Sequence, residues 1–349
     1  MGPSEHELAG LKRMRTLKHR NLIRMITWYD FAETRAFLMP EYLMDLNEYM
    51  VGKTVADFDA PHQGPRRNSR RDPQSKDSPY RFPTNHWLWR GIVGVLDGLQ
   101  KFHGSGDGEE RAAHLDLKPK NILIGYDGNL VIIDCGLSRV VTPWESSMTQ
   151  ADGEDDKGTY ELVDEGTASY KPPRTQLKWN IPLTTLSEKC DIWSMACIMM
   201  EVMLFLIYGK GSVEEFRKGR ISKSRGAIHD TFWECSPGGD TFHLKQVVES
   251  HLDKVQQISE LLDDYDLENQ ITLLRRMFNM SPDERPTVGE CLTQLNSERP
   301  TFRRASIRFG LGGTVNSLRI NTRLAEEQYE LGYYGKSKMP PQLQPVSGL

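Results

Sequence analysis

The strongest constraint on the fold is residues 192–208, IWSMACIMMEVMLFLIY, the most apolar stretch of the chain. Asp191 precedes this stretch and Glu201 interrupts it, so it falls short of the roughly 20 consecutive apolar residues that span a bilayer. A helix that is apolar all round has to be covered on every side. We therefore predict a buried central helix and no membrane span. A chain of 349 residues is long enough to surround such a helix in a soluble, globular fold.

Charge and cysteine usage narrow the class of protein. The formal net charge is -4, whereas a dedicated nucleic-acid binder carries a strongly basic surface, so we expect no nucleic-acid partner. The five cysteines are scattered and form no Cys-x-x-Cys pair, which argues against a disulfide framework and against a zinc site. This usage is typical of a reducing compartment and predicts an intracellular protein, in the cytoplasm or the nucleus.

Apolar periodicity organises the first hundred residues. Four apolar side chains recur at helical spacing over residues 8–17, and residues 31–43 hold two apolar runs around a polar turn. A helix followed by two strands is the prediction. Residues 86–103 show a second amphipathic pattern, with Asn85 as the expected cap. Residues 59–81 are rich in Pro, Ser, Arg and Asp and almost free of large apolar side chains, so we expect a disordered insertion there.

Polar residues with chemical potential gather in residues 113–124, AHLDLKPKNILI. Asp116, Lys118 and Asn121 lie on a loop that leaves a helix and enters the apolar run NILI. An Asp-Gly turn joins this run to LVIID, so we predict a hairpin that brings Asp134 back beside Asn121. A carboxylate and an amide oxygen form a hard, oxygen-rich site that suits Mg²⁺. Phosphoryl transfer needs such a metal, a positive group and an orienting carboxylate, so these residues predict that chemistry.

The same motifs resemble those of the eukaryotic protein kinases. HLDLKPKN at residues 114–121 is similar to the family's catalytic loop, and DCG at residues 134–136 is similar to its magnesium-binding triplet. GTASYKPPR, DIWSMACIMMEV and DERPT follow in the family's order. They resemble the end of the activation segment, the buried central helix and the motif before the last helix. The lysine and proline that follow Asp116 resemble the serine/threonine branch of the family.

The resemblance implies a role for each residue of the site. Asp116 is expected to be the catalytic base and Lys118 to contact the transferred phosphate, while Asn121 and Asp134 hold Mg²⁺. ATP is the implied cofactor and a protein is the implied substrate. By the same resemblance, Asp191 braces the catalytic loop and Thr167 orders the segment near Asp116. Further residues implied to bind ATP are Glu41 and Leu43, and further structural or regulatory residues are Glu7, His114 and Arg285.

The front of the chain departs from the family pattern. The glycine-rich loop and the strand with the phosphate-pairing lysine are not found, and residues 1–20 already resemble the helix that offers a glutamate to that lysine, with Glu7 as the candidate. We therefore expect an α+β, protein-kinase-like fold. Its mainly helical large lobe would comprise residues 51–299, and its incomplete β-rich small lobe residues 1–50. Residues 300–349 are expected to form a flexible tail.

Local departures concern packing and regulation. Leu115 stands where many family members place an arginine that collects a phosphorylated loop, and Cys135 replaces a phenylalanine that packs on the first helix. Arg174 replaces a glutamate that pairs with an arginine, here Arg285. We expect these two cations to face each other unless a carboxylate such as Glu188 intervenes. The metal and base chemistry does not depend on these positions.

Together these features favour an enzyme that uses ATP to phosphorylate serine or threonine in protein substrates. The missing front favours an alternative, a pseudokinase or truncated kinase fragment that serves as a binding scaffold. Retention of Asp116, Lys118, Asn121 and Asp134 favours catalysis, because a scaffold has no physical need for that combination. A third possibility, a small-molecule kinase of similar fold, is disfavoured by the lysine and proline after Asp116 and by the long activation segment.

Overall fold

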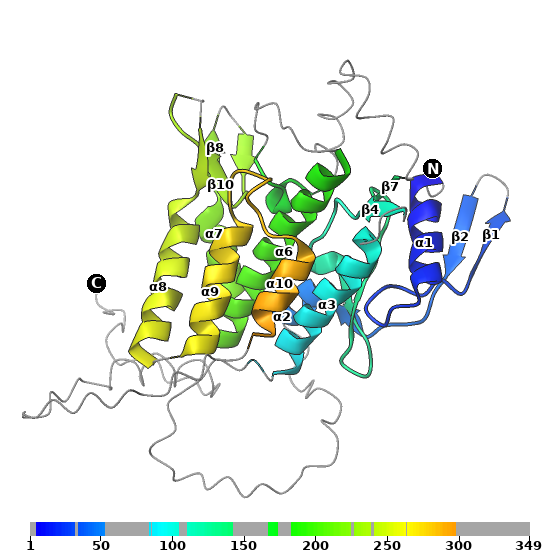
Figure 1. The fold of residues 1–349 in the computed structure, drawn as a ribbon, viewed down its shortest axis with the longest axis horizontal. Coiled ribbons are helices and arrows are strands. Elements are labelled where there is room, and N and C mark those ends of the chain that lie inside the picture. The colour runs from blue at the N-terminus through cyan, green and yellow to red at the C-terminus, as the bar shows by residue number, and fades with distance from the viewer. Residues whose placement is uncertain are drawn as a thin grey trace, which may run out of the picture.

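The computed structural model describes residues 5–31, 34–52, 84, 86–104, 110–141, 167–173, 183–224, 227–238, 241–262 and 264–297. Within these ranges the chain has a mixed α+β architecture, with an N-terminal part that contains strands and a mainly helical C-terminal part (Figure 1). The predicted insertion at 59–81, the predicted tail at 300–349, Asn85 and Arg174 lie outside the described residues.

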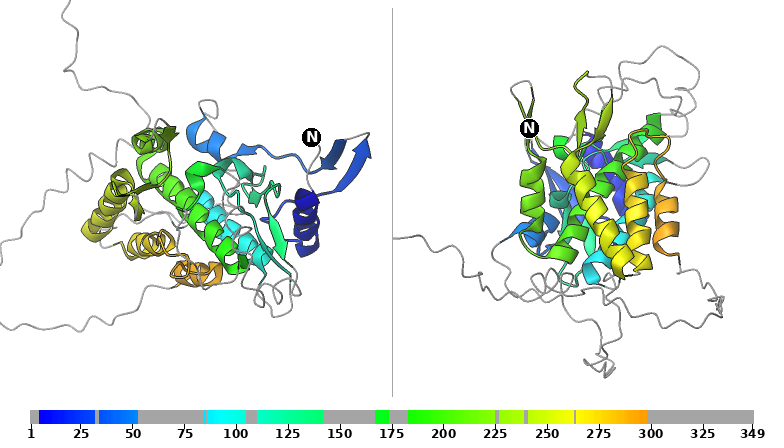
Figure 2. Two further views of the ribbon diagram at one scale, coloured as in Figure 1. Left: turned by 90° about the horizontal axis from the view of Figure 1, so that it is seen from above. Right: turned by 90° about the vertical axis from the view of Figure 1, so that its left-hand side faces the viewer.

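The N-terminal part consists of a helix and a hairpin. Helix α1 (Glu5–Leu17) confirms the helical spacing of residues 8–17, and β1 (Thr27–Phe31) pairs antiparallel with β2 (Thr34–Leu38). The ring of Trp28 on β1 lies 5.2 Å from Lys12 Nζ on α1, so a cation–π contact joins the hairpin to the helix. The helix and the hairpin lie together at one end of the molecule (Figures 1 and 2).

Short strands connect this part to the helices. The sheet β3–β5–β6 is antiparallel and contains β3 (Met44–Asp45), β5 (Ile122–Ile124) and β6 (Leu130–Ile132). Gly128 in the turn between β5 and β6 has φ 76°, which a residue without Cβ adopts at little steric cost. The hairpin predicted from the Asp-Gly turn is therefore confirmed. A second antiparallel pair joins β4 (Arg111–Ala113) to β7 (Arg139–Val141).

Two described helices lie between β3 and β4 in the sequence. Helix α2 (Leu46–Val51) follows β3 directly, and a reciprocal pair of hydrogen bonds between Asp45 and Glu48 caps its first turn. Helix α3 (Trp87–His103) confirms the amphipathic pattern of residues 86–103. Its cap lies one residue later than predicted, because His86 Nδ1 accepts a hydrogen bond from Leu88 N at 3.2 Å.

The C-terminal part is built around one long helix, α6 (Leu183–Tyr208). The elements that follow are α7 (Ser212–Arg220), β8 (Ser222–Ser224), β9 (Ala227–His229), β10 (Trp233–Cys235), β11 (Phe242–Leu244), α8 (Gln246–Leu262), α9 (Tyr265–Met277) and α10 (Val288–Leu295). Helix α9 packs against both α6 and α8, and α10 packs against α3 and α9. Strand β8 pairs with β9 and β10 pairs with β11, and Figure 1 shows these two hairpins at one end of the helices.

Burial of α6 confirms the prediction from the apolar stretch. Every side chain from residue 189 to residue 204 is buried. Among the described helices, α6 is the one whose segment Glu188–Tyr208 is long and apolar enough to cross a membrane, yet 94% of its most apolar window is buried inside the fold. It therefore has the character of a core helix, whose cover is protein.

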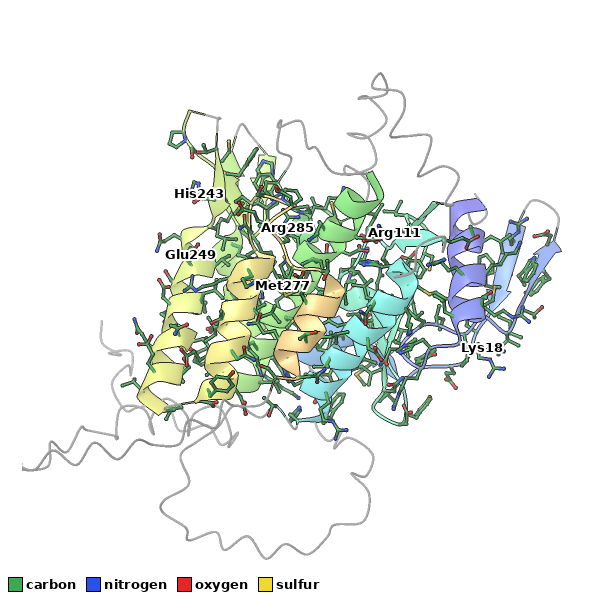
Figure 3. The ribbon with its side chains drawn as sticks, in the orientation of Figure 1. Lys18, Arg111, His243, Glu249, Met277 and Arg285 are labelled. Atoms are coloured by element: carbon green, nitrogen blue, oxygen red, sulfur yellow. The ribbon has the colours of Figure 1, made fainter. Side chains whose placement is uncertain are left out.

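Glu188 and Arg285 each have other partners in the structure. Glu188 forms a bidentate ion pair with Arg111, one of whose hydrogen bonds, from Nε to Oε1, measures 2.9 Å. Arg285 is buried and donates to backbone carbonyls, among them Lys189 O at 2.9 Å, and its guanidinium lies 5.1 Å from the ring of Trp193. Figure 3 labels both arginines. Glu188, named as a carboxylate that could separate Arg285 from Arg174, is therefore paired with Arg111, and the expected meeting of Arg174 with Arg285 stays a prediction because Arg174 lies outside the described residues.

Candidate active site

One buried carboxylate, that of Asp191, binds the backbone of the loop that follows β4. Asp191 on α6 accepts hydrogen bonds from His114 N at 2.7 Å, from Leu115 N at 2.8 Å and from His103 Nε2 at 2.8 Å. Leu115 has φ 65°, a left-handed conformation that a branched side chain rarely adopts. The two bonds from the loop amides to Asp191 compensate for that strain. Asp191 is fully buried, so these bonds do not compete with water.

His114 links the loop to the neighbouring hairpin. Its Nε2 donates to Ile133 O at 2.8 Å, and its Nδ1 accepts from Asp116 N at 3.3 Å. The ring is fully buried, and both of its nitrogens are used. The imidazole therefore sets the position of the Asp116 backbone relative to the strand that leads to Asp134.

The Asp116 carboxylate is the centre of the cluster. Its Oδ1 accepts from Thr167 N at 2.8 Å and from Thr167 Oγ1 at 2.9 Å. Its Oδ2 accepts from Lys118 Nζ at 2.6 Å and from Asn121 Nδ2 at 3.1 Å. Burial by itself raises the pKa of Asp116, but the hydrogen bonds from Lys118 and Thr167 outweigh burial and leave this pKa below its usual value. The carboxylate is therefore ionised at neutral pH.

Thr167 brings a distant segment to the loop. It lies far along the chain from Asp116, and besides its two bonds to that carboxylate its Oγ1 accepts from Lys118 Nζ at 2.8 Å. The short turn η2 (Ala168–Tyr170) starts directly after it. The structure thus brings together Asp116, Lys118, Asn121 and Thr167, four residues that the sequence analysis singled out.

Asn121 directly precedes β5 and Asp134 lies two residues after β6, so both lie at the end of the hairpin opposite its turn. Ile133 N donates to Asn121 O at 3.0 Å, which brings the residue before Asp134 next to Asn121. Asp134 is exposed, has φ 63°, and accepts from Gly136 N at 3.2 Å. The Asn121 amide nitrogen is occupied by Asp116, which leaves the amide oxygen as the group that can bind a cation. Among the described residues no three His, Cys, Asp or Glu side chains cluster as a ready metal site, so a cation here would rely on one amide and one carboxylate.

Helix α1 packs closely against residues 134–138, called the Asp134 loop below, at Gly10, which has no side chain. A Cβ added to Gly10 would lie 2.4 Å from Cys135 Cβ and 2.5 Å from Ser138 Oγ. One turn further, Cys135 Sγ lies 3.5 Å from Met14 Sδ. Glu7 is half-buried on α1, and burial followed by the negative charge of Asp134 raises the pKa of Glu7. The sequence analysis named Glu7 but missed Gly10, because a glycine in a helical pattern carries no signal of what approaches it.

Glu41 and Leu43 lie in the segment before β3. Glu41 is exposed and Leu43 is half-buried. The Leu43 amide donates to Ile124 O at 2.9 Å, so this amide is already used within the sheet. The prediction that both residues bind the cofactor stays a prediction, and for Leu43 it cannot rest on the amide.

A buried polar network beside η2 had no clear sequence signal. Glu201 on α6 accepts from Tyr170 OH at 3.0 Å and from Arg217 Nε at 2.9 Å, and its Oε1 lies 3.4 Å from Arg220 Nη2. Arg217 Nη1 also donates to Asn47 Oδ1 at 2.6 Å, which connects α7 to α2. In the sequence, Glu201 was visible only as an interruption of an apolar run. Its partners come from segments that are distant along the chain.

Comparison with known proteins identifies the family of the sequence. A sequence model of the protein kinase domain matches residues 4–295. Cyclin-dependent kinase C-2 C of Arabidopsis thaliana is 28% identical over 207 residues, which are 58% of this chain and 27% of that protein. Mitogen-activated protein kinase 12 is 29% identical in Mus musculus and 30% in Homo sapiens over 202 residues, which are 58% of this chain and 47% of each relative. The matched region thus spans less than half the length of these relatives.

Proposed function

The chain belongs to the protein kinase family, and on this premise we propose that the protein transfers the terminal phosphoryl group of ATP to serine or threonine hydroxyls of protein substrates. The observation that carries the proposal is the bonded cluster around Asp116, in which Lys118 and Thr167 contact the carboxylate directly. A cluster of this kind orients a hydroxyl and holds a positive charge beside it. Those are the two protein contributions that phosphoryl transfer needs most.

In this proposal Asp116 orients the attacking hydroxyl and accepts its proton. Its lowered pKa makes it a weak base, which suits a reaction in which the nucleophile needs positioning more than deprotonation. Lys118 neutralises the carboxylate in the free protein at 2.6 Å and would turn to the transferred phosphate when substrate binds. Asp191 and His114 keep the loop backbone in place while this happens.

The proposed cofactors are ATP and Mg²⁺. The Asn121 amide oxygen and the Asp134 carboxylate are hard oxygen donors at the same end of the β5–β6 hairpin, and this donor set fits Mg²⁺. When bound at these two residues, Mg²⁺ would supply positive charge beside the transferred phosphate. The chain's own contribution is to hold the two oxygen donors on a rigid hairpin, with Asn121 oriented by its bonds to Asp116.

An intracellular site of action is part of the proposal. The cysteines of the described residues are all free thiols, and Cys135, Cys190, Cys197 and Cys291 are buried. Burial raises the pKa of each of these four thiols, so they stay protonated and unreactive. Free thiols suit a reducing compartment such as the cytoplasm or nucleus.

The division into a small lobe at 1–50 and a large lobe at 51–299 also stays a proposal.

The decisive experiment removes the charge of Asp116. Asp116→Asn should lower transfer of radiolabelled phosphate from ATP to an arrayed serine/threonine peptide library by about 10²-fold or more, because the orienting carboxylate is lost. Asp127→Asn makes the same chemical change on the exposed turn of the hairpin and should leave transfer unchanged. A wild type whose transfer is no higher than the residual transfer of Asp116→Asn would contradict the proposal and favour the scaffold alternative.

A further inference from the structure

The turn η2 lies next to the Asp116 carboxylate. It begins directly after Thr167, whose amide and hydroxyl both contact that carboxylate. Ala168 at its start is exposed. Under the proposed function, a polypeptide that presents a hydroxyl to Asp116 therefore has this exposed turn beside its neighbouring residues.

The inner side of the turn is held by α6. Ser194 Oγ donates to Tyr170 O at 2.9 Å, and Tyr170 OH donates to Glu201 at 3.0 Å. Both Ser194 and Glu201 are buried, and Tyr170 is buried with them. These bonds hold one end of the turn, but they leave Ser169 and the Lys171 carbonyl to other partners.

The outer side of the turn is held by the segment between the two hairpins. Ser169 Oγ donates to Asp230 Oδ1 at 2.6 Å, and Trp233 Nε1 donates to Lys171 O at 2.9 Å. Asp230 follows β9 and Trp233 begins β10. The residues before and after Tyr170 are thus each bonded to residues 230–233, called the hairpin segment below.

The hairpin segment is itself anchored firmly enough to serve as a support. Phe232, between the two contacts, is fully buried and lies 3.8 Å from the Arg220 guanidinium. Lys245 Nζ closes the segment by donating to Arg220 O at 2.5 Å and to His229 O at 3.2 Å. Because Asp230 and Trp233 are held in this way, their hydrogen bonds can fix the position of η2.

We infer that Asp230 and Trp233 are positioning residues that set the substrate-facing turn, so that residues 230–233 act as a specificity element for the protein substrate. The inference rests on the proposed function and adds to it. Asp230 and Trp233 do not touch the reacting atoms; they act through Ser169 and Lys171. Their effect should therefore fall on the recognition of the polypeptide and leave the handling of ATP as it is.

The test uses the full chain and variants that keep the fold. Trp233→Phe removes the indole donor but keeps a ring against Phe242, whose centroid lies 5.2 Å away. Asp230→Ala removes an exposed acceptor. Hydrogen exchange of the Tyr170 and Lys171 amides, which donate to Thr167 O at 3.1 Å and Ala168 O at 3.2 Å, reports the turn without any need for turnover. Loss of the Ser169–Asp230 or the Trp233–Lys171 hydrogen bond should speed this exchange about three- to tenfold.

The matching kinetic measurement uses the peptide that wild type phosphorylates best in an arrayed library. We expect KM for this peptide to rise about three- to tenfold in either variant, with kcat and KM for ATP unchanged. The relative preference for residues that flank the phosphorylated position should change as well. Asp230→Ala and Ser169→Ala should be non-additive, because they remove the same bond. Glu234→Ala, an acidic residue of the same hairpin paired with His243 at 3.3 Å, is the matched control and should change nothing.

The outcomes separate the inference from the proposed function. Faster exchange together with a raised peptide KM supports the inference. An active wild type whose exchange or peptide KM does not respond to either variant overturns the inference alone. A wild type that phosphorylates no peptide in the library refutes the proposed function, and the inference falls with it whatever the exchange shows.

Discussion

Helices α6 and α1 both reach the candidate site, but they hold it by different physical means. From α6, Asp191 holds the loop at His114 and Leu115 by directional hydrogen bonds at 2.7 and 2.8 Å in a fully buried setting. From α1, Gly10 and Met14 contact the Asp134 loop by close packing on Cys135. The comparison teaches that one side of the site depends on satisfied polar groups and the other on shape. The two sides should therefore respond differently to substitution.

The largest effect is expected on the hydrogen-bonded side. Asp191→Asn puts an amide nitrogen where the loop amides and His103 need acceptors, so at least one buried donor loses its partner. We expect the free energy of unfolding to fall by about 3 kcal/mol and phosphate transfer to fall with it, because Leu115 loses its support. Urea denaturation followed by tryptophan fluorescence measures the change.

A matched surface variant controls that prediction. Asp97 pairs with His19 at 3.0 Å, and its side chain is 53% exposed. Asp97→Asn should change the free energy of unfolding by less than about 0.5 kcal/mol. Equal effects of the two variants would show that burial of the Asp191 bonds does not matter, and the contrast between the two helices would be lost.

An intermediate effect is expected on the packed side, and its sign is informative. Helix propensity alone predicts that Gly10→Ala stabilises α1 by about 0.5 to 1 kcal/mol. The added methyl group would lie 2.4 Å from Cys135 Cβ, so the helix or the Asp134 loop has to shift. We expect a net loss of about 1 to 3 kcal/mol, with a raised KM for ATP. Differential scanning calorimetry and steady-state kinetics measure the two quantities.

The neighbouring residue supplies the control for helix propensity. Ala9 is exposed on the same turn of α1, so Ala9→Gly reports propensity without a change of packing and should leave KM for ATP unchanged. If Gly10→Ala stabilised the protein, the close approach of α1 to the Asp134 loop would not be tight. Shape would then not explain how α1 holds the site.

The smallest effect concerns the titration of Asp116. Hydrogen bonds from Thr167 help to hold the pKa of Asp116 below its usual value against the opposing effect of burial. Thr167→Ala removes the hydroxyl and keeps the backbone amide bond, so this pKa should rise. A carboxyl group whose pKa is lowered in the folded state stabilises the fold above its unfolded pKa, and that contribution disappears as the pH falls through the folded pKa.

The acid limb of unfolding tests this sign. Thr167→Ala should lose stability at a higher pH than wild type, and the acid limb of phosphate transfer should move the same way. Thr167→Ser retains an oxygen that can donate to Asp116, so it should behave as wild type in both measurements. Identical acid limbs for the alanine and serine variants would contradict a role for the Thr167 hydroxyl in setting this pKa.

Features that depend on neighbouring residues could be read from the sequence. The spacing of residues 8–17 and 86–103 predicted α1 and α3, and the Asp-Gly turn predicted the β5–β6 hairpin. The apolar run at 192–208 predicted the burial of α6. Helical periodicity and turn chemistry act over a few residues, so a linear pattern is enough to report them. The spacing of Asp116, Lys118 and Asn121 on one loop belongs to the same class.

Choices between distant partners were decided by the tertiary structure alone. Glu188 pairs with Arg111 rather than with Arg285, and Glu201 connects Tyr170 to Arg217 in a buried network. Gly10 lies against Cys135, and Asp230 and Trp233 reach the turn after Thr167. A sequence pattern tells which face of an element is buried, but it carries no information on which other element covers that face. Partners therefore emerge only when the chain folds, because a hydrogen bond or a close contact depends on separation in space and not on separation along the chain.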